Sequence, residues 1–444
     1  MRCTRCGGGV WTPRAEETCD ADALVSERRT WLLELCQGVN ERNLRAVLLP
    51  ELVRSKEILQ QVLLNFCQQT KGYKLVIATI EIIRQDGTFE LNFYNYNVGI
   101  SAYAKAKQWQ QALQLLVAMP AAKVQPTVIS YSAAISACEK GGQWQQALKL
   151  LVAMPAAKVQ PNVFSYSGAV SACEKGGQWQ QALQLFEAMM EAKVQPNVIS
   201  YSAAISACEK GGQWQQALKL LAVMPGAKVQ PNVISYSAAI SACEKSGQWQ
   251  QALKLIEAML EAKVQVNAFS CSAAISSCEK GGQWRQALDL FEAMLGAIVR
   301  PDVINYSAAI SACEKGGQWQ QALKLFEAMS NENVQPNVVS FNAAMSACEK
   351  GGHFQQALKL FKVMLEENVQ PDIISYSAAI SACERVGKWQ QALKLLEAMP
   401  KAKVQPDVIF FSAAISACEK GRQWLRALKL FEELQLQTLT PISL

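Results

Sequence analysis

The sequence predicts an all-α solenoid of helix-turn-helix hairpins, and three observations lead to that prediction. The stretch 128–162, VISYSAAISACEKGGQWQQALKLLVAMPAAKVQPN, returns with few changes at a fixed period of 35 residues. Each copy holds two apolar patterns of helical spacing, and glycines separate the two. A period in this range is typical of stacked repeat arrays, in which each unit contacts only its neighbours. We therefore expect one elongated body, rather than the several globular domains that 444 residues would otherwise suggest.

Ten copies account for residues 93–442. They begin at Phe93, Val128, Val163, Val198, Val233, Ala268, Val303, Val338, Ile373 and Val408. Upstream, residues 30–92 lose the tandem identity but keep helical patterning, so we expect a degenerate helical cap that includes a divergent repeat at 57–92. Residues 1–29 have no apolar core of a secretory signal and too many acidic residues for an ordinary organelle transit peptide. We expect this segment to be disordered.

The first helix of the copy at 128–162 is predicted by apolar residues that recur at helical spacing. Its apolar face consists of Tyr131, Ala134, Ile135 and Cys138. Gly141 and Gly142 should end this helix, because glycine adopts a left-handed C-cap without steric cost.

The second helix of the copy follows the glycines. Its apolar face consists of Trp144, Ala147, Leu148, Leu151 and Met154. Pro155 and Pro161 should stop the helix, because proline lacks the N–H donor and crowds the preceding turn. Phe354 replaces the tryptophan in the eighth copy. We interpret these aromatic residues as structural core between hairpins.

Composition narrows the possible function classes. The net charge of +6 is mildly basic, which permits a polyanionic partner without requiring one. No run of about 18 apolar residues occurs, so we expect no membrane span.

Stacked helices lie about 8–10 Å apart, whereas bridged cysteines need Cα atoms within about 7 Å. We therefore interpret the recurring cysteines as buried thiols in a reducing compartment. They are Cys138, Cys173, Cys208, Cys243, Cys278, Cys313, Cys348, Cys383 and Cys418.

The sequence lacks the residues of a catalytic or metal site. Cys3 and Cys6 form a CxxC pair and Cys19 follows, but the only histidine is His353 and no second CxxC pair occurs. We predict no metal and no other cofactor. No glycine-rich phosphate loop is present, and the acidic residues recur with the period. We therefore expect a binding protein rather than an enzyme.

Two polar positions stand apart from the apolar faces. The fifth residue of each copy comes directly after the core tyrosine and should face outward: Asn97, Ser132, Ser167, Ser202, Ser237, Ser272, Ser307, Asn342, Ser377 and Ser412. The last residue lies in the loop before the next first helix: Thr127, Asn162, Asn197, Asn232, Asn267, Asp302, Asn337, Asp372, Asp407 and Ile442. Both sets should line one edge of the stack. Ser, Asn and Asp also form helix caps and turns, and the residues alone leave this alternative open.

These features together resemble the pentatricopeptide repeat (PPR) family, in its P-type arrays of 35-residue repeats. The resemblance covers 93–442 and rests on the period, the opening VISYSAAI, the middle EKGGQWQQALKLL, the ending VQPN and the two polar positions. It implies a right-handed superhelix that holds single-stranded RNA in its groove, one nucleotide per repeat, with the amino end toward the 5′ side. A tetratricopeptide-like scaffold that binds protein is the alternative, but such a scaffold has no reason to restrict both polar positions.

The resemblance also implies a base for most copies. In the family, Ser at the fifth position goes with purines and Asn with pyrimidines, while a last-position Asn suits adenine and Asp suits the N–H donors of guanine or uracil. Adenine is indicated by Ser132 with Asn162, Ser167 with Asn197, Ser202 with Asn232, Ser237 with Asn267, and Ser307 with Asn337. Guanine is indicated by Ser272 with Asp302 and Ser377 with Asp407, and uracil by Asn342 with Asp372. The expected target is near 5′-AAAAGAUG-3′, and the two end copies are assigned no base.

Two further sets complete the implied RNA site. The second residue of each copy resembles the apolar wedge that the family places between bases: Ile129, Phe164, Ile199, Ile234, Phe269, Ile304, Val339, Ile374 and Ile409. Packing at the helix start is the alternative for this set. Cations that neighbour phosphates in the family recur late in the first helix: Lys140, Lys175, Lys210, Lys245, Lys280, Lys315, Lys350, Arg385 and Lys420. The glutamate before each cation should cancel much of its field.

The expected partner is therefore single-stranded RNA, bound by a monomer without catalysis. The family implies a role in RNA processing, stabilisation or translation in a mitochondrion or plastid. Because residues 1–29 do not resemble a good targeting segment, the cytoplasm is the alternative location. The sequence does not identify the transcript or any protein effector.

Overall fold

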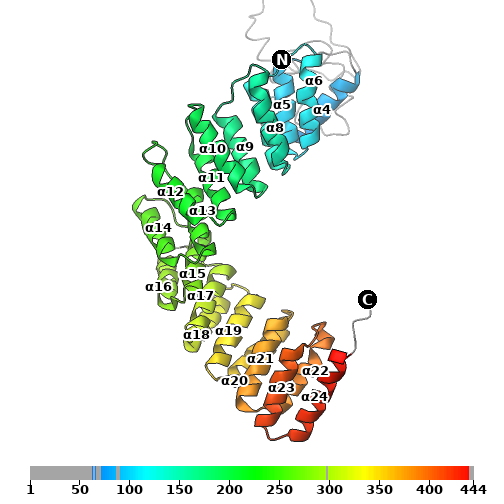
Figure 1. Cartoon of the computed structure of the whole chain (residues 1–444), viewed down its shortest axis with the longest axis vertical. Coiled ribbons are helices and arrows are strands. Elements are labelled where there is room, and N and C mark those ends of the chain that lie inside the picture. The colour runs from blue at the N-terminus through cyan, green and yellow to red at the C-terminus, as the bar shows by residue number, and fades with distance from the viewer. Residues whose placement is uncertain (1–62, 64–65, 67–71, 87–90, 297–298, 440–444) are drawn as a thin grey trace, which may run out of the picture. The chain divides into compact units, whose positions relative to one another are not determined.

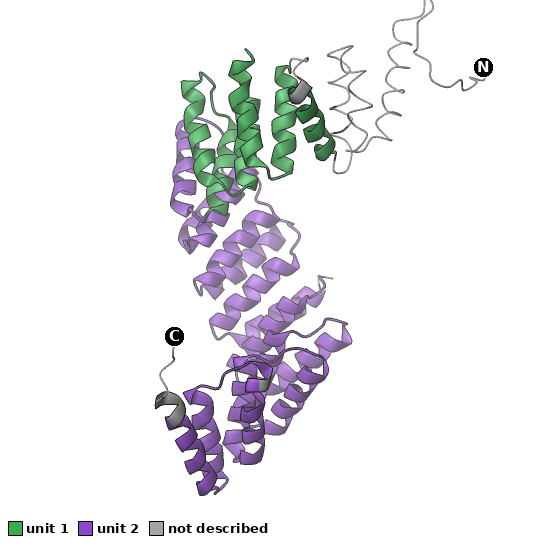
Figure 2. Cartoon of the chain, turned by 90° about the vertical axis from the view of Figure 1, so that its right-hand side faces the viewer, with its two compact units in different colours: residues 1–176 green, residues 177–444 purple. Residues whose placement is uncertain are grey.

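The computed structural model describes residues 63, 66, 72–86, 91–296 and 299–439 (Figure 1). The expected disordered segment at 1–29, most of the expected cap at 30–92, and Ile442 lie outside these residues. The chain divides into two compact units, residues 1–176 and residues 177–444 (Figure 2).

Helices form all the regular structure of the described residues in both units. Unit 1 contains α4 (Tyr73–Asp86), α5 (Phe93–Lys105), α6 (Trp109–Ala121), α7 (Val128–Lys140), α8 (Trp144–Ala156) and α9 (Val163–Lys175). Unit 2 contains α10 (Trp179–Glu191), α11 (Val198–Lys210), α12 (Trp214–Val223), α13 (Val233–Lys245), α14 (Trp249–Glu261), α15 (Ala268–Lys280), α16 (Trp284–Gly296), α17 (Val303–Lys315), α18 (Trp319–Asn331), α19 (Val338–Lys350), α20 (Phe354–Glu366), α21 (Ile373–Val386), α22 (Trp389–Ala398), the 3₁₀ turn Pro400–Ala402, α23 (Val408–Lys420) and α24 (Trp424–Leu439). The predicted all-α fold of stacked helical hairpins is confirmed.

The hairpins stack in the same way throughout each unit. From α5 onward, odd-numbered helices are the first helices of the copies and even-numbered helices are the second helices. Within a unit, neighbouring first helices pack side by side, and each second helix packs on its own first helix and on the next one. The amphipathic faces are thus buried between copies, which gives one continuous core along each unit.

The recurring cysteines lie in that core. All nine are free thiols and fully buried, as the sequence predicted. Burial raises the pKa of the thiols of Cys138 and Cys208 to about 11 and that of Cys313 to about 12. At neutral pH these side chains therefore remain protonated and act as small apolar groups.

Six of the ten first helices end in a glycine pair, as at Gly141 and Gly142, and the two members of the pair have different tasks. Gly142 adopts the left-handed conformation, with φ of 71°, and Gln143 N–H donates to the Cys138 carbonyl across the cap. Gly141 has an ordinary backbone, but a Cβ at this position would lie 2.5 Å from Cδ1 of Trp109 in the preceding copy. The first glycine therefore makes room for a tryptophan, and the second supplies the turn.

The prediction that Pro155 stops the second helix is wrong. Pro155 lies inside α8, which continues to Ala156. A proline in the last turn removes only one hydrogen bond, to the carbonyl four residues earlier, so the helix tolerates it there. The helix ends because Lys158 takes a left-handed conformation, with φ of 59°. Lys158 and Val159 then donate their N–H groups to the carbonyls of Pro155 and Met154, which is a Schellman cap.

Candidate functional site

The fifth and last residues of a copy come together in the structure. The Ser202 hydroxyl lies 3.4 Å from Oδ1 of Asn232, and the Ser307 hydroxyl lies 3.5 Å from Oδ1 of Asn337. The Asn342 amide donates to the Asp372 carboxylate at 3.0 Å. These pairs are 30 residues apart in sequence, yet each forms one polar site at the amino-terminal end of two consecutive first helices.

The expectation that the fifth residues face outward is wrong for most copies. Their side chains are only 4–8% exposed at Asn97, Ser167, Ser202, Ser237, Ser272, Ser307 and Asn342. The next first helix packs across this position and its third residue makes the contact. The Ser130 hydroxyl donates to Oδ1 of Asn97 at 2.6 Å, and the Asn305 amide donates to Oγ of Ser272 at 2.7 Å.

Three fifth residues differ. Ser132 and Ser377 are half-buried, and Ser412 is exposed. The Ser412 hydroxyl donates to the Ile409 carbonyl of its own helix, α23, and no first helix follows α23 among the described residues. The fifth position is therefore the floor of a site between two copies. It is buried in most copies, half-buried at Ser132 and Ser377, and exposed at Ser412.

The last residue of each of the first nine copies, Thr127 to Asp407, is the N-cap of the next first helix. Oδ1 of Asn162 accepts the N–H groups of Phe164 and Ser165 at 3.1 Å each. Oδ1 of Asp302 accepts the corresponding N–H groups of α17, at 2.9 and 3.0 Å. The capping alternative is thus correct for these residues. Among the described residues, however, neither Nδ2 of Asn162 nor Oδ2 of Asp302 makes a hydrogen bond.

Capping therefore leaves a single side-chain atom of Asn162 and of Asp302 for a ligand. In Asn that atom is a donor NH₂, and in Asp it is an acceptor oxygen. The assignment of the amide is fixed physically, because the atom that accepts two backbone N–H groups must be the oxygen.

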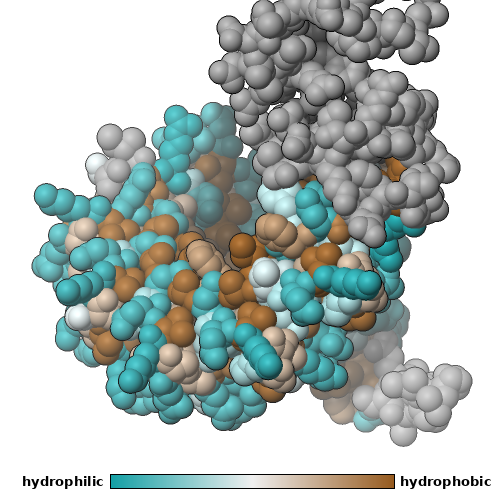
Figure 3. All heavy atoms as spheres, turned by 90° about the horizontal axis from the view of Figure 1, so that it is seen from above, coloured by the Kyte–Doolittle hydropathy of each residue, from teal (hydrophilic) through white to brown (hydrophobic). Residues whose placement is uncertain are grey.

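The second residues of the copies form a set of exposed apolar side chains. Their exposed fractions run from 55% to 68%. The set consists of Ile129, Phe164, Ile199, Ile234, Phe269, Ile304, Val339, Ile374 and Ile409. Packing at the helix start does not explain these residues, because more than half of each side chain contacts solvent. On the face shown in Figure 3, hydrophobic residues are spread among hydrophilic ones rather than gathered in one patch.

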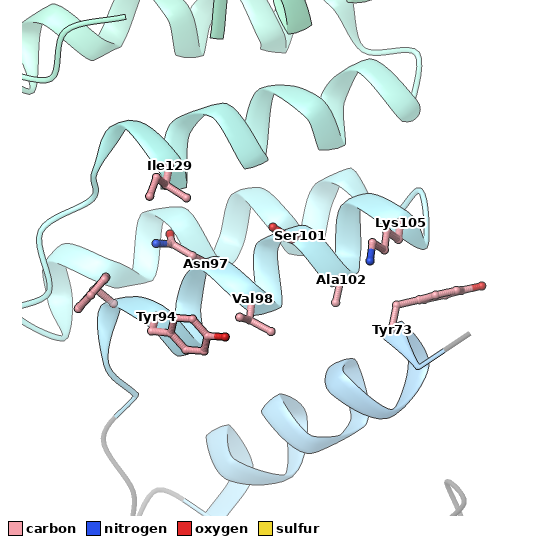
Figure 4. Close-up of a pocket in the computed structure, with 9 residues that line it drawn as sticks. Tyr73, Tyr94, Asn97, Val98, Ser101, Ala102, Lys105 and Ile129 are labelled. Carbon is pink, nitrogen blue, oxygen red and sulfur yellow. The ribbon is translucent and has the colours of Figure 1, made fainter. Parts of the chain in front are cut away.

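A pocket in unit 1 shows how these positions are arranged around one cavity. Its volume is about 280 Å³, and its lining includes Tyr94 and Ile129, the second residues of two consecutive copies, with the fifth residue Asn97 (Figure 4). In the close-up, Asn97 lies between Ile129 and Tyr94. Tyr73 of α4 and Lys105 at the end of α5 also line the cavity.

Three of these pocket residues, Tyr73, Tyr94 and Lys105, were not predicted from the sequence. Tyr94 could have been found, because it occupies the second position of the copy that begins at Phe93. Lys105 could also have been found, because it occupies the thirteenth position of the same copy, where the other copies carry the recurring cation. Tyr73 could not, because it approaches the pocket through the packing of α4 against α5.

The recurring cations are mostly held in ion pairs. Seven of them contact the glutamate of the preceding copy, rather than being weakened by the glutamate beside them in sequence. These pairs are Lys175 with Glu139, Lys245 with Glu209, Lys280 with Glu244, Lys315 with Glu279, Lys350 with Glu314, Arg385 with Glu349, and Lys420 with Glu384. The carboxylates are 13–27% exposed and the cations 44–50% exposed. A cation that already contacts a carboxylate attracts a second anion more weakly.

The described residues contain no cluster of three or more potential metal ligands. None of the described helices is long and apolar enough to cross a membrane.

The hairpin stack with a repeated polar site defines the chain as a helical-repeat binding protein, and sequence comparison identifies the family. Matches occur to the PPR repeat family at 301–350 and 336–385, to the pentatricopeptide repeat domain at 83–141 and 149–211, and to the PPR repeat at 129–159, 199–229, 234–264, 269–297, 374–404 and 409–437. Together these matches cover more than half of the sequence. The chain belongs to the pentatricopeptide repeat family. A search of curated proteins found no match to this sequence.

Solved structures share the fold at low sequence identity. The pentatricopeptide repeat protein PPR10 in complex with an 18-nt psaJ RNA element has a TM-score of 0.56 and 17% identity, over 94% of this chain and 67% of that chain. A cysteine-to-serine variant of PPR10 with the same RNA element gives the same values. PPR10 from maize has a TM-score of 0.48 and 19% identity, over 96% of this chain and 74% of that chain.

Proposed function

We propose that the protein binds single-stranded RNA sequence-selectively, one nucleotide per hairpin, at a site near 5′-AAAAGAUG-3′. The observation that carries this proposal is the site formed by the fifth and last residues, where one unused donor or acceptor atom lies at a junction flanked by exposed apolar second residues. Bases of a single strand expose the Watson–Crick edge that such an atom can contact. The RNA complexes of PPR10, which shares the fold, support the same class of ligand.

The unused atom accounts for the difference between Asn and Asp copies. N1 of adenine is an acceptor and suits Nδ2 of Asn162 or Asn232. N1–H of guanine and N3–H of uracil are donors and suit the free oxygen of Asp302 or Asp372. The fifth residue is buried beside this atom, and we assign to it the choice between purine and pyrimidine, as the family resemblance implies.

Copy five offers additional support. Oγ of Ser237 is buried and has no hydrogen-bond partner among the described residues, while its partner position Asn267 is exposed. Buried polar atoms without a partner are rare in folded proteins. This oxygen has less than 1 Å² of accessible surface, so a base would supply the missing partner only through a rearrangement that exposes the hydroxyl on binding.

The proposed mode of action is occupancy of an RNA site rather than catalysis. A monomer would block nucleases, remodel a hairpin or guide another factor, and so serve RNA processing, stabilisation or translation. The location in a mitochondrion or plastid is carried over from the family.

Titration of the full chain with labelled RNA tests the proposal. We expect single-stranded AAAAGAUG to bind at least tenfold more tightly than a pyrimidine-rich RNA of the same length, because each mismatched contact should cost about 1 kcal/mol or more. The same sequence in a duplex should compete poorly, since its Watson–Crick edges are occupied. Equal affinity for the two single strands would overturn the assignment.

A further inference from the structure

One junction between first helices lacks the carboxylate that the others have. At seven junctions between neighbouring first helices, the glutamate at the twelfth residue of one copy forms an ion pair with the cation at the thirteenth residue of the next copy. These junctions are α7/α9 in unit 1 and the six from α11/α13 to α21/α23 in unit 2. At the α5/α7 junction, Ala104 occupies the twelfth position. Lys140 therefore has no carboxylate opposite it.

The intact junctions show what surrounds the missing group. At α7/α9, the Glu139 carboxylate accepts hydrogen bonds from the Ser171 hydroxyl at 2.9 Å and from the Lys175 ammonium at 2.7 Å. Ser346 and Ser416 donate to the carboxylates at their own junctions in the same way, at 3.0 and 2.9 Å. The ninth and thirteenth residues of a first helix thus form a donor pair, one turn apart, that binds an oxyanion.

Ser136 and Lys140 are the same donor pair on α7. Ser136 is half-buried and Lys140 is exposed. Among the described residues, neither side chain makes a hydrogen bond or an ion pair. Ser136 and Lys140 therefore occupy the same positions on α7 as Ser171 and Lys175 on α9, but Ala104 offers them no acceptor.

The surrounding charge also favours an anion. The first copy, 93–127, is the only one of the ten without an Asp or Glu, and it carries Lys105, Lys107 and Lys123. Lys105 lines the pocket beside Tyr94 and Asn97, so a cation also lies next to the candidate base site of this copy (Figure 4). The acidic side chains near the α5/α7 junction lie outside the first copy. Glu139, beside Lys140 in sequence, accepts from Ser171 and Lys175. Glu81 of α4 accepts from the hydroxyl of Tyr103.

We propose that Ser136 and Lys140 bind a backbone phosphate of the RNA in place of the missing carboxylate, which makes the amino-terminal junction the main electrostatic anchor of the array. A phosphate presents oxyanion acceptors to the same hydroxyl and ammonium donors that hold Glu139 at the next junction. The seven paired cations contribute less, because a phosphate must compete there with a carboxylate that is already bound. This inference rests on the proposed RNA-binding function and assigns its phosphate contacts unequally.

Ala104→Glu is the direct test, because it supplies the missing carboxylate from within the chain. The variant should weaken RNA binding about fivefold near 0.1 M salt and lower the slope of log K against log salt by about 0.7, the value for one contact to a single strand. Lys140→Gln removes the ammonium instead and should lower the slope by the same amount.

Two control variants separate a local site from a general charge effect. Ala104→Gln has the size of glutamate without its charge and should leave the slope unchanged. Ala156→Glu adds the same charge at the end of α8, where copies three and five naturally carry Glu191 and Glu261, and should cost less than Ala104→Glu.

The inference is overturned if Ala104→Glu changes the slope no more than Ala156→Glu does, or if Lys140→Gln leaves the slope unchanged. These results are distinct from a failure of the proposed function. In that case the unmodified protein would show no preference for AAAAGAUG, whatever its salt dependence.

Discussion

The two ends of each first helix differ in how well their side chains are satisfied within the protein. At the carboxyl end, Glu209 is paired with Lys245, and a glycine such as Gly281 packs so closely on the tryptophan of the preceding copy that a Cβ would clash with it. At the amino end, Ile199 and Ile234 are more than half exposed, and Nδ2 of Asn232 has no partner among the described residues. Unsatisfied groups that recur in several copies point to a ligand, so the amino ends are the candidate site and the carboxyl ends are scaffold. Variants at the amino end should change RNA binding without changing stability. Variants at the carboxyl end should do the reverse, except at the α5/α7 junction, where Ser136 and Lys140 are proposed to bind phosphate.

The largest effect is expected from the exposed apolar residues. Replacing Ile199, Ile234 and Ile304 together by alanine should weaken RNA binding by about 3 kcal/mol, roughly 100-fold, because a side chain stacked on a base contributes about 1 kcal/mol or more. The urea unfolding midpoint should hardly move, because these side chains are 55–58% exposed in the free protein.

A matched control comes from the second helices. Val117, Val152 and Val223 are 51–75% exposed, and their triple replacement by alanine removes similar apolar surface away from the proposed site. Affinity for RNA should stay within about twofold of the unmodified protein. If the two triple variants lost the same affinity for RNA, the second residues of the copies would contribute no more to binding than other exposed apolar side chains.

The carboxyl end of a first helix is tested at Gly281, which follows α15. A Cβ there would lie 2.3 Å from Cδ1 of Trp249, so Gly281→Ala should destabilise unit 2 by about 1–3 kcal/mol through overpacking. The ratio of affinities for matched and shuffled RNA should not change. Unfolding in urea and RNA titration of the same preparation measure the two quantities.

The sequence itself suggests the compensating change. Phe354 is the one aromatic that is smaller than tryptophan at this position, and the copy after it carries Val386 in place of glycine. Trp249→Phe should therefore recover part of the stability lost in Gly281→Ala. If the double variant is less stable than either single variant, the packing account of the glycine is wrong.

Local features of the fold could be predicted from the sequence, because they depend on neighbouring residues. The 35-residue period and the helical spacing predicted the hairpins, and the buried Cys138 and its equivalents followed from the apolar face. Pro155 was misjudged because the sequence does not show that Lys158 takes the left-handed conformation that ends α8. Few residues other than glycine and asparagine adopt that conformation readily.

Contacts between copies could not be read from the sequence. The burial of Asn97 depends on Ser130, and the pairing of Lys175 with Glu139 joins residues 36 positions apart. Within one copy, Lys175 follows Glu174 directly, and that proximity led to the wrong partner. The same limitation hid the significance of Ala104, which departs from the pattern only when two stacked helices are compared.

The most direct test of base selection by the last residue is the variant Asn232→Asp. Aspartate caps α13 as well as asparagine does, so the melting temperature should be unchanged, while the free atom becomes an acceptor. Titration with AAAAGAUG and AAGAGAUG should show that the unmodified protein prefers the first RNA and that the variant prefers the second, with a reversal of about 1–2 kcal/mol in relative affinity. An affinity ratio for the two RNAs that is the same in both proteins would contradict the account.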